Sequence, residues 1–236
     1  AMNKNSNTYT IVYISCIVVA VGAILALAAM VLKPLQQHNA DADKMKQILA
    51  SVHITPAEDS VIEDFDRYIT AQYVVDEQGR VIGSDAFGVD VAAQTKIADA
   101  AQRRLPIYKC TLADGETKYI IPAYGAGLWG PIWGYIALDA DGSTVYGAYF
   151  SHQGETPGLG AEIQEPWFSG QFEGKQLFHG SEFAPIQVLK KGRKPTGGAD
   201  YVDAVSGGTI TSKGVSAMLD DCLRPYKVYL ESLRDK

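Results

Sequence analysis

The chain has 236 residues, of which 47% are hydrophobic and 10% aromatic, and its formal net charge at pH 7 is -6. This composition predicts a folded core and excludes an intrinsically disordered chain. Nucleic-acid binding is disfavoured because phosphate contacts need a broad basic surface. The longest basic run is the short segment 190–194, which we interpret as a solvated loop.

The cysteines and histidines do not form a metal-binding pattern. The three cysteines, Cys16, Cys110 and Cys222, include no Cys-x-x-Cys pair, and none of the four histidines is spaced as a metal pair. Neither a zinc site nor a self-contained iron–sulfur centre is therefore predicted. Cys110 and Cys222 either form a disulfide in an oxidising compartment or remain two buried thiols, and the sequence leaves both interpretations open.

An uncharged apolar segment, residues 11–32, lies near the start of the chain. Its length of about 22 residues matches the roughly 20 that a helix needs to cross the hydrocarbon core of a bilayer. Tyr9 and Tyr13 stand at its start, where aromatic rings favour the membrane interface. These features predict a membrane-spanning helix.

Lys33 and Pro34 close the apolar run, so we predict a transmembrane helix over residues 11–33, preceded by a short tail at residues 1–10. A cleaved signal peptide is the alternative. The apolar run is longer than an ordinary signal core and no small-x-small cleavage site follows it, which favours an anchor that is retained. Local charge does not decide the orientation; a cytoplasmic N-terminus with an external domain is preferred.

Residues 43–54 repeat apolar side chains at helical spacing, from Met45 to Val52, and predict a stalk helix that ends near Ile54. The whole stalk is assigned to residues 34–56.

A second helix is predicted to follow the stalk directly. Thr55 is the expected N-cap, with Pro56 at the first helical position and Glu58 three residues after the cap. The apolar face of this helix is expected to run from Val61 to Ile69.

Alternating apolar residues and glycine turns then predict three β-hairpins and one further strand. The hairpin strands are expected at residues 72–76 with 81–84, 107–112 with 117–121, and 133–139 with 144–150, and the last strand at 183–189. A C-terminal helix is expected over residues 211–233, kinked or divided at Pro225. The predicted fold class is α+β: an antiparallel sheet of hairpins with flanking helices, preceded by one N-terminal transmembrane helix, with a single soluble domain at residues 57–236.

Three glycine-rich segments are the candidate site. The first, residues 124–134, alternates glycine with tryptophan and forms either a structural turn or a close approach to a planar ligand, with Trp129 as the stacking face. The second, residues 152–161, follows a strand and includes a Pro157-Gly158 turn; it is either a plain loop or a binding loop. His152 is the nearest candidate base, with a surface or supporting role favoured.

The third segment, residues 203–214, combines four hydroxyl residues with glycines and continues into a helix. A helix N-terminus presents unpaired N–H groups and positive partial charge to an anion. One N-cap needs one hydroxyl, so four of them favour a phosphate site over an ordinary cap. No GxxxxGK[ST] or Rossmann GxGxxG pattern is present, which argues against a nucleotide hydrolase.

The third segment resembles the flavinylation motif Asp-x-x-Ser/Thr-Gly-Ala-Thr, whose last threonine is esterified to the phosphate of FMN by a flavin transferase. Asp203, Ser206, Gly207 and Thr209 match, and Gly208 stands where alanine is usual. The second segment, Glu-Thr-Pro-Gly-Leu-Gly-Ala-Glu-Ile, and the Gly-Leu-Trp of the first are similar to those of the C subunit of the sodium-translocating NADH:quinone reductases. The likeness covers essentially the whole chain.

The resemblance implies an electron-transfer subunit with covalent FMN on Thr209, in a bacterial inner-membrane complex of six subunits that oxidises NADH, reduces ubiquinone or menaquinone and pumps sodium. It implies a periplasmic FMN domain, recognition of Asp203 by the flavin transferase, and no nucleic-acid partner. The implied cofactor-binding residues are Trp129, Glu155, Thr156, Gly158, Leu159, Gly160, Ser206, Gly207, Gly208 and Thr211. Two alternatives remain open: the homologous G subunit of ferredoxin:NAD reductase, and a membrane-tethered binding module without a redox role.

Overall fold

The computed structural model describes residues 7–234. The chain divides into two compact units, the first ending at Lys44 and the second beginning at Met45. The first six residues of the predicted tail lie outside the described range.

One helix, α1 (Asn7–Ala50), replaces the separate anchor and stalk helices that the sequence predicts. It is long and apolar enough to cross a membrane. Pro34 lies inside α1, so no helix end separates the predicted anchor at residues 11–33 from the predicted stalk, and these bounds stay predictions. Proline fixes φ near the helical value, so a helix can continue through it at the cost of one hydrogen bond.

Helix α1 ends four residues before the predicted Ile54 because His53 adopts a left-handed conformation, with φ 62°. The N–H of Ile54 donates to the carbonyl of Leu49 at 3.1 Å, and the N–H of His53 donates to that of Ala50 at 3.1 Å. This pair of bonds is the Schellman arrangement that closes many helices. Glycine usually occupies the left-handed position, so a histidine there gives no sequence signal.

Helix α2 (Val61–Tyr68) begins later than predicted, and Thr55 is not its N-cap. Ser60 occupies the cap position, and its hydroxyl donates to the Asp64 carboxylate at 2.8 Å. Ser60 is also followed by a glutamate three residues on, so the same capping spacing occurs twice in this stretch. Ile69, predicted on the helix face, is instead the first residue of strand β1.

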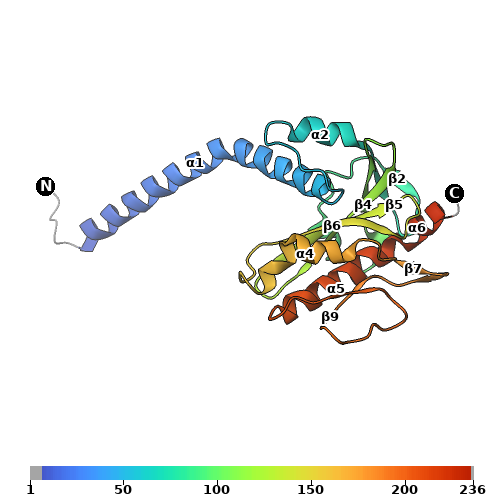
Figure 1. The fold of residues 1–236 in the computed structure, drawn as a ribbon. Helices are drawn as coiled ribbons and strands as arrows, with labels where there is room; N and C mark the ends of the chain where they lie inside the picture. The colour runs from blue at the N-terminus through green and yellow to red at the C-terminus, as the bar shows by residue number, and fades with distance from the viewer. Residues whose placement is uncertain (1–6, 235–236) are drawn as a thin grey trace. The chain divides into compact units, whose positions relative to one another are not determined.

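A six-stranded antiparallel sheet in the order β2-β1-β3-β4-β5-β6 forms the centre of the second unit. Figure 1 labels β2, β4, β5 and β6 of this sheet. All three predicted hairpins are present. Their turns contain Gly79, Gly115 and Gly142, each with positive φ, as tight hairpin turns require. The strands are β1 (Ile69–Val75), β2 (Val81–Gly83), β3 (Leu105–Thr111), β4 (Thr117–Ala126), β5 (Pro131–Asp139) and β6 (Val145–His152). The α+β fold class is confirmed.

Two hydrophobic cores are built on this sheet. The larger core joins the sheet to the C-terminal helices, with Ile132, Phe168 and Leu219 among its buried members. The smaller core contains Ile48 and Leu49 from the end of α1 together with Phe65 of α2. Cys222 belongs to the larger core and Cys110 to the smaller, and both thiols are free and buried. Burial raises the pKa of each thiol to about 11.

The C-terminal helix is divided at Pro225, as predicted, although it begins at Thr209 and not at Thr211. Its parts are α5 (Thr209–Leu223), a 3-10 turn η4 (Arg224–Tyr226) and α6 (Lys227–Arg234). Helix α5 packs against β4 and β9. This packing fixes the helix start, where the candidate site lies.

The predicted strand at residues 183–189 is wrong, because Pro185 lacks the N–H that a continuous ladder needs. Two short strands replace it, and they belong to separate two-stranded sheets. Strand β8 (Glu182–Phe183) pairs with β7 (Phe178–His179), and β9 (Gln187–Leu189) pairs in parallel with β10 (Tyr201–Asp203). The remaining short helices are α3 (Val91–Gln94), η1 (Ala100–Gln102), η2 (Gly160–Gln164), α4 (Pro166–Ser169) and η3 (Gly170–Phe172).

Candidate functional site

The third glycine-rich segment contains the end of β10, the loop at residues 204–208 and the first residues of α5. Thr209 is the first residue of α5, and Gly208 occupies the N-cap position without any side-chain capping bond. The first N–H groups of a helix have no acceptor within the helix. The start of α5 is therefore not closed by a hydroxyl, although four hydroxyl residues surround it.

The four hydroxyls divide into two pairs. Thr211 and Ser212 are buried, each 1% exposed; Thr211 donates to the Glu155 carboxylate, and Ser212 accepts the N–H of Val205 at 3.1 Å. Ser206 and Thr209 are exposed and line a cavity. The buried pair fixes the loop, and the exposed pair remains available to a ligand.

Glu155 connects the three glycine-rich segments. Its buried carboxylate accepts the N–H of Trp129 at 2.8 Å from the first segment and the hydroxyl of Thr211 from the third. Its own N–H donates to Nδ1 of His152 at 3.1 Å. Burial by itself would raise the pKa of Glu155, but the bonds from Thr211, Trp129 and Leu128 outweigh it and lower that pKa below its usual value.

The second and third segments pack backbone against backbone. A Cβ atom on Gly160 would collide with the Glu155 carboxylate and the Thr211 hydroxyl, and one on Gly207 would collide with Leu159. Gly207 also has φ 76°, a conformation that other residues rarely adopt. A Cβ on Gly208 would lie 3.2 Å from the Cα of Gly160, so a methyl group is crowded there. This contact gives a physical reason for glycine where the flavinylation motif usually has alanine.

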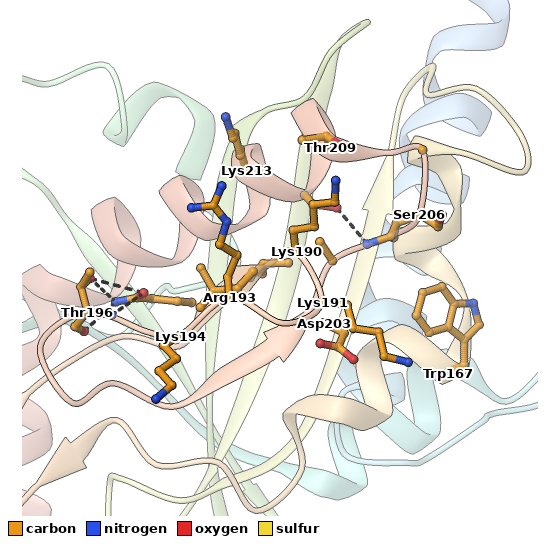
Figure 2. Close-up of a pocket in the computed structure, with 17 residues that line it drawn as sticks. Trp167, Lys190, Lys191, Arg193, Lys194, Thr196, Asp203, Ser206, Thr209 and Lys213 are labelled. Carbon is orange, nitrogen blue, oxygen red and sulfur yellow. Dashed lines mark hydrogen bonds between the residues drawn. The ribbon is translucent and has the colours of Figure 1, made fainter.

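A cavity of about 880 Å³ opens beside Thr209. One wall is made by five basic side chains, which Figure 2 labels: Lys190, Lys191, Arg193, Lys194 and Lys213. Trp167, half exposed, lines it as well. Sequence reasoning placed Lys213 at the phosphate site but missed the contribution of residues 190–194, because it treated that basic run as an isolated solvated loop. The lining residues are Trp167, Gln187, Val188, Leu189, Lys190, Lys191, Arg193, Lys194, Thr196, Asp203, Ala204, Val205, Ser206, Gly207, Thr209, Ser212 and Lys213.

Large apolar side chains are exposed on all three segments. They are Leu128 and Trp129 of the first, Leu159 of the second and Ile210 of the third, with Trp129 69% exposed. None of these four lines the cavity. The region around Thr209 therefore offers a basic cavity and, separately, exposed apolar surface.

Of the residues that the sequence singles out, Asp203, Ser206, Gly207 and Thr209 line the cavity together. Glu155, Gly160, Gly208 and Thr211 form the buried connection between the segments. In the second segment, the carbonyl of Thr156 accepts the N–H groups of Leu159 and Ala161, and Gly158 has φ 75°, so these residues shape the loop.

The chain is similar to C subunits of Na(+)-translocating NADH-quinone reductases along most of its length. The chain is 33% identical to the C subunit of Na(+)-translocating NADH-quinone reductase from Vibrio anguillarum, over 93% of this chain and 91% of the relative. It is 34% identical to the C subunit of Yersinia pestis, over 88% of this chain and 84% of that one. The chain belongs to the family of C subunits of Na(+)-translocating NADH-quinone reductases.

The crystal structure of a C subunit from Parabacteroides distasonis matches with a TM-score of 0.78 and 45% identity, over 84% of this chain and 96% of that one. A model of the FMN-binding domain family matches residues 127–224 of the chain. This range contains Trp129, Glu155, Thr209 and the basic wall of the cavity. Membership of the C-subunit family and the domain match confirm the predicted resemblance and support FMN as the cofactor.

Proposed function

We propose that the chain is an electron-transfer subunit that carries FMN esterified through its phosphate to the hydroxyl of Thr209. The observation that carries this proposal is the exposed Thr209 at the first position of α5, behind an N-cap without a side-chain bond and within the Asp203–Thr209 motif. FMN in such a position supplies one-electron chemistry. The task of the chain is to hold it and to orient it.

The residues around Thr209 fit the two ends of FMN. A phosphoryl group on Thr209 would lie at the N-terminal N–H groups of α5, which favour an anion. The exposed faces of Trp129 and Leu159 offer apolar surface to a planar ring. The contacts of Glu155 hold the loops that bear these groups in a fixed relation.

The subunit is proposed to work in a bacterial inner-membrane complex of six subunits that oxidises NADH, reduces ubiquinone or menaquinone and pumps sodium ions. Helix α1 supports a membrane anchor at residues 11–33, followed by a stalk. The FMN domain, from residue 57 onward, is proposed to face the periplasm. Asp203 lines the cavity beside Thr209. This position supports its proposed recognition by a flavin transferase during maturation. The C-subunit relatives favour this function over that of the G subunit.

Maturation beside a flavin transferase tests the proposal. The full chain co-expressed with the transferase should gain the mass of one FMN phosphoryl adduct and should fluoresce as a flavin band on a denaturing gel. Thr209→Val should abolish both signals. Thr211→Ser is the control and should keep the adduct on Thr209, because serine retains the hydroxyl that donates to Glu155. Flavin fluorescence from the denatured Thr209→Val chain would refute the assignment, and a chain without flavin would fit a binding module without a redox role.

A further inference from the structure

The cavity beside Thr209 concentrates positive charge in an otherwise acidic chain. Five cationic side chains line it, and Asp203 is the single carboxylate among the lining residues. The chain as a whole carries a formal charge of -6. The five are Lys190, Lys191, Arg193, Lys194 and Lys213.

These cations have no anionic partner within residues 7–234. Other basic side chains of the chain do pair, as Arg103 does with Asp221 and Lys118 with Glu116 and Asp139. None of the five cavity cations takes part in an ion pair with a described residue. Like charges gathered without a counter-charge repel one another, so an anion in the cavity relieves that repulsion.

The position of the basic loop is set by strand pairing. Strands β9 and β10 run parallel, with Leu189 opposite Asp203. Parallel strands end at the same edge of their sheet, so the basic loop that leaves β9 and the Thr209 loop that leaves β10 emerge side by side. This pairing brings residue 190 next to the start of the Thr209 loop, although more than a dozen positions separate them in the chain.

Specific bonds shape the basic loop. The N–H of Arg193 donates to the carbonyl of Lys190 at 2.9 Å, and Gly192 between them has φ 84°. A positive φ at this place is what a type II turn requires. At the base of the loop, the Gln187 amide donates to the carbonyl of Thr196 and accepts the Thr196 N–H, at 3.0 and 3.1 Å.

We propose that Lys190, Arg193 and Lys213 hold the phosphoryl group on Thr209. Figure 2 shows these three side chains on the side of the basic loop that Thr209 occupies, whereas Lys194 points away. The inference rests on the proposed attachment of FMN to Thr209. A phosphodiester retains one negative charge and two free oxygens, and charge-assisted hydrogen bonds from lysine and arginine are the strong partners for such oxygens.

Phosphorus NMR on the matured full chain tests this assignment directly. Replacing Lys190, Arg193 and Lys213 together by glutamine should move the ³¹P resonance of the Thr209 phosphodiester and remove its response to added salt. The control replaces Arg67, Lys96 and Arg104 by glutamine; it makes the same change in net charge, outside the cavity lining. The ³¹P resonance of the control should superimpose on that of the unmodified sequence.

Limited trypsin digestion gives a second measurement that leaves Lys190, Arg193 and Lys213 unchanged. Cleavage after Lys190 and Arg193 should be several-fold slower in the flavinylated chain than in Thr209→Val, whereas cleavage after Arg67 should be equal in both. An adduct on Thr209 with an unmoved ³¹P resonance and equal trypsin rates would overturn the inference and leave the proposed function standing. Absence of any adduct on Thr209 would overturn both.

Discussion

The two sides of the loop at residues 203–209 differ in whether their polar groups are buried and hydrogen-bonded or exposed to solvent. On one side, the buried Glu155 carboxylate accepts hydrogen bonds from the buried Thr211 hydroxyl and from the N–H of Trp129. On the other side, the exposed hydroxyls of Ser206 and Thr209 line the cavity together with cations that have no ion-pair partners among the described residues. Thr211 therefore belongs to the buried, closed side and Thr209 to the exposed, open side, although only two positions separate them in the chain.

This difference follows from the cost of burying polar groups. A buried carboxylate is tolerated only when hydrogen bonds replace its water, and removing one partner leaves the others unsatisfied. An exposed cation keeps its hydration and contributes little to the stability of the fold. The closed side should therefore respond to mutation through stability, and the open side through ligand binding.

The largest effect on stability is expected from Gly160→Ala, because the new methyl group collides with the Glu155 carboxylate and the Thr211 hydroxyl. Overpacking of this kind should lower the free energy of unfolding by about 2–3 kcal/mol. Urea unfolding of the full chain in detergent, followed by tryptophan fluorescence, measures it. Gly154→Ala is the matched control, since no atom lies within 4 Å of its added Cβ. Equal stability of the two variants would contradict the closed arrangement around Glu155.

A smaller loss is expected from Glu155→Gln, which keeps the shape of the side chain but removes its charge. Weaker bonds to Thr211 and the Trp129 N–H should lower the free energy of unfolding by about 1–2 kcal/mol at neutral pH.

The loss caused by Glu155→Gln should also depend on pH. The folded-state pKa of Glu155 is lowered from 4.5, so its ionised form stabilises the fold above that pH. This contribution disappears as the pH falls through the lowered value. The stability difference between the unmodified chain and the Glu155→Gln variant should therefore shrink steadily in urea titrations below pH 4.5. A difference that stays constant into strong acid would show that the charge of Glu155 is not the cause.

The smallest effect on stability is expected on the open side. Lys190→Gln and Arg193→Gln should each change the free energy of unfolding by less than about 0.5 kcal/mol, because neither side chain is in an ion pair with a described residue. The same urea titration measures it. A loss as large as that of Glu155→Gln would show that the basic loop supports the fold, and the contrast between the two sides would no longer hold.

Local patterns of the sequence determined much of this protein. The glycine turns between alternating apolar residues predicted three hairpins, Pro225 predicted the division of the last helix, and the segment ending at Thr209 predicted the candidate site. These features depend on a few neighbouring residues. Glycine permits a tight turn and proline lacks an N–H wherever they stand, so the remainder of the chain does not change their effect. The apolar run of α1 is equally local.

Only the tertiary structure decided which groups around Thr209 are available to a ligand. The motif resemblance singles out Thr209, but composition alone does not show that Thr211 and Ser212 are closed to solvent; their bonds to Glu155 and Val205 bury them. The basic loop reaches the cavity through parallel pairing of two three-residue strands, which are too short to leave a periodic signal. Such contacts join residues far apart in the chain, so no local pattern encodes them, and burial is what separates the exposed Thr209 hydroxyl from those of Thr211 and Ser212.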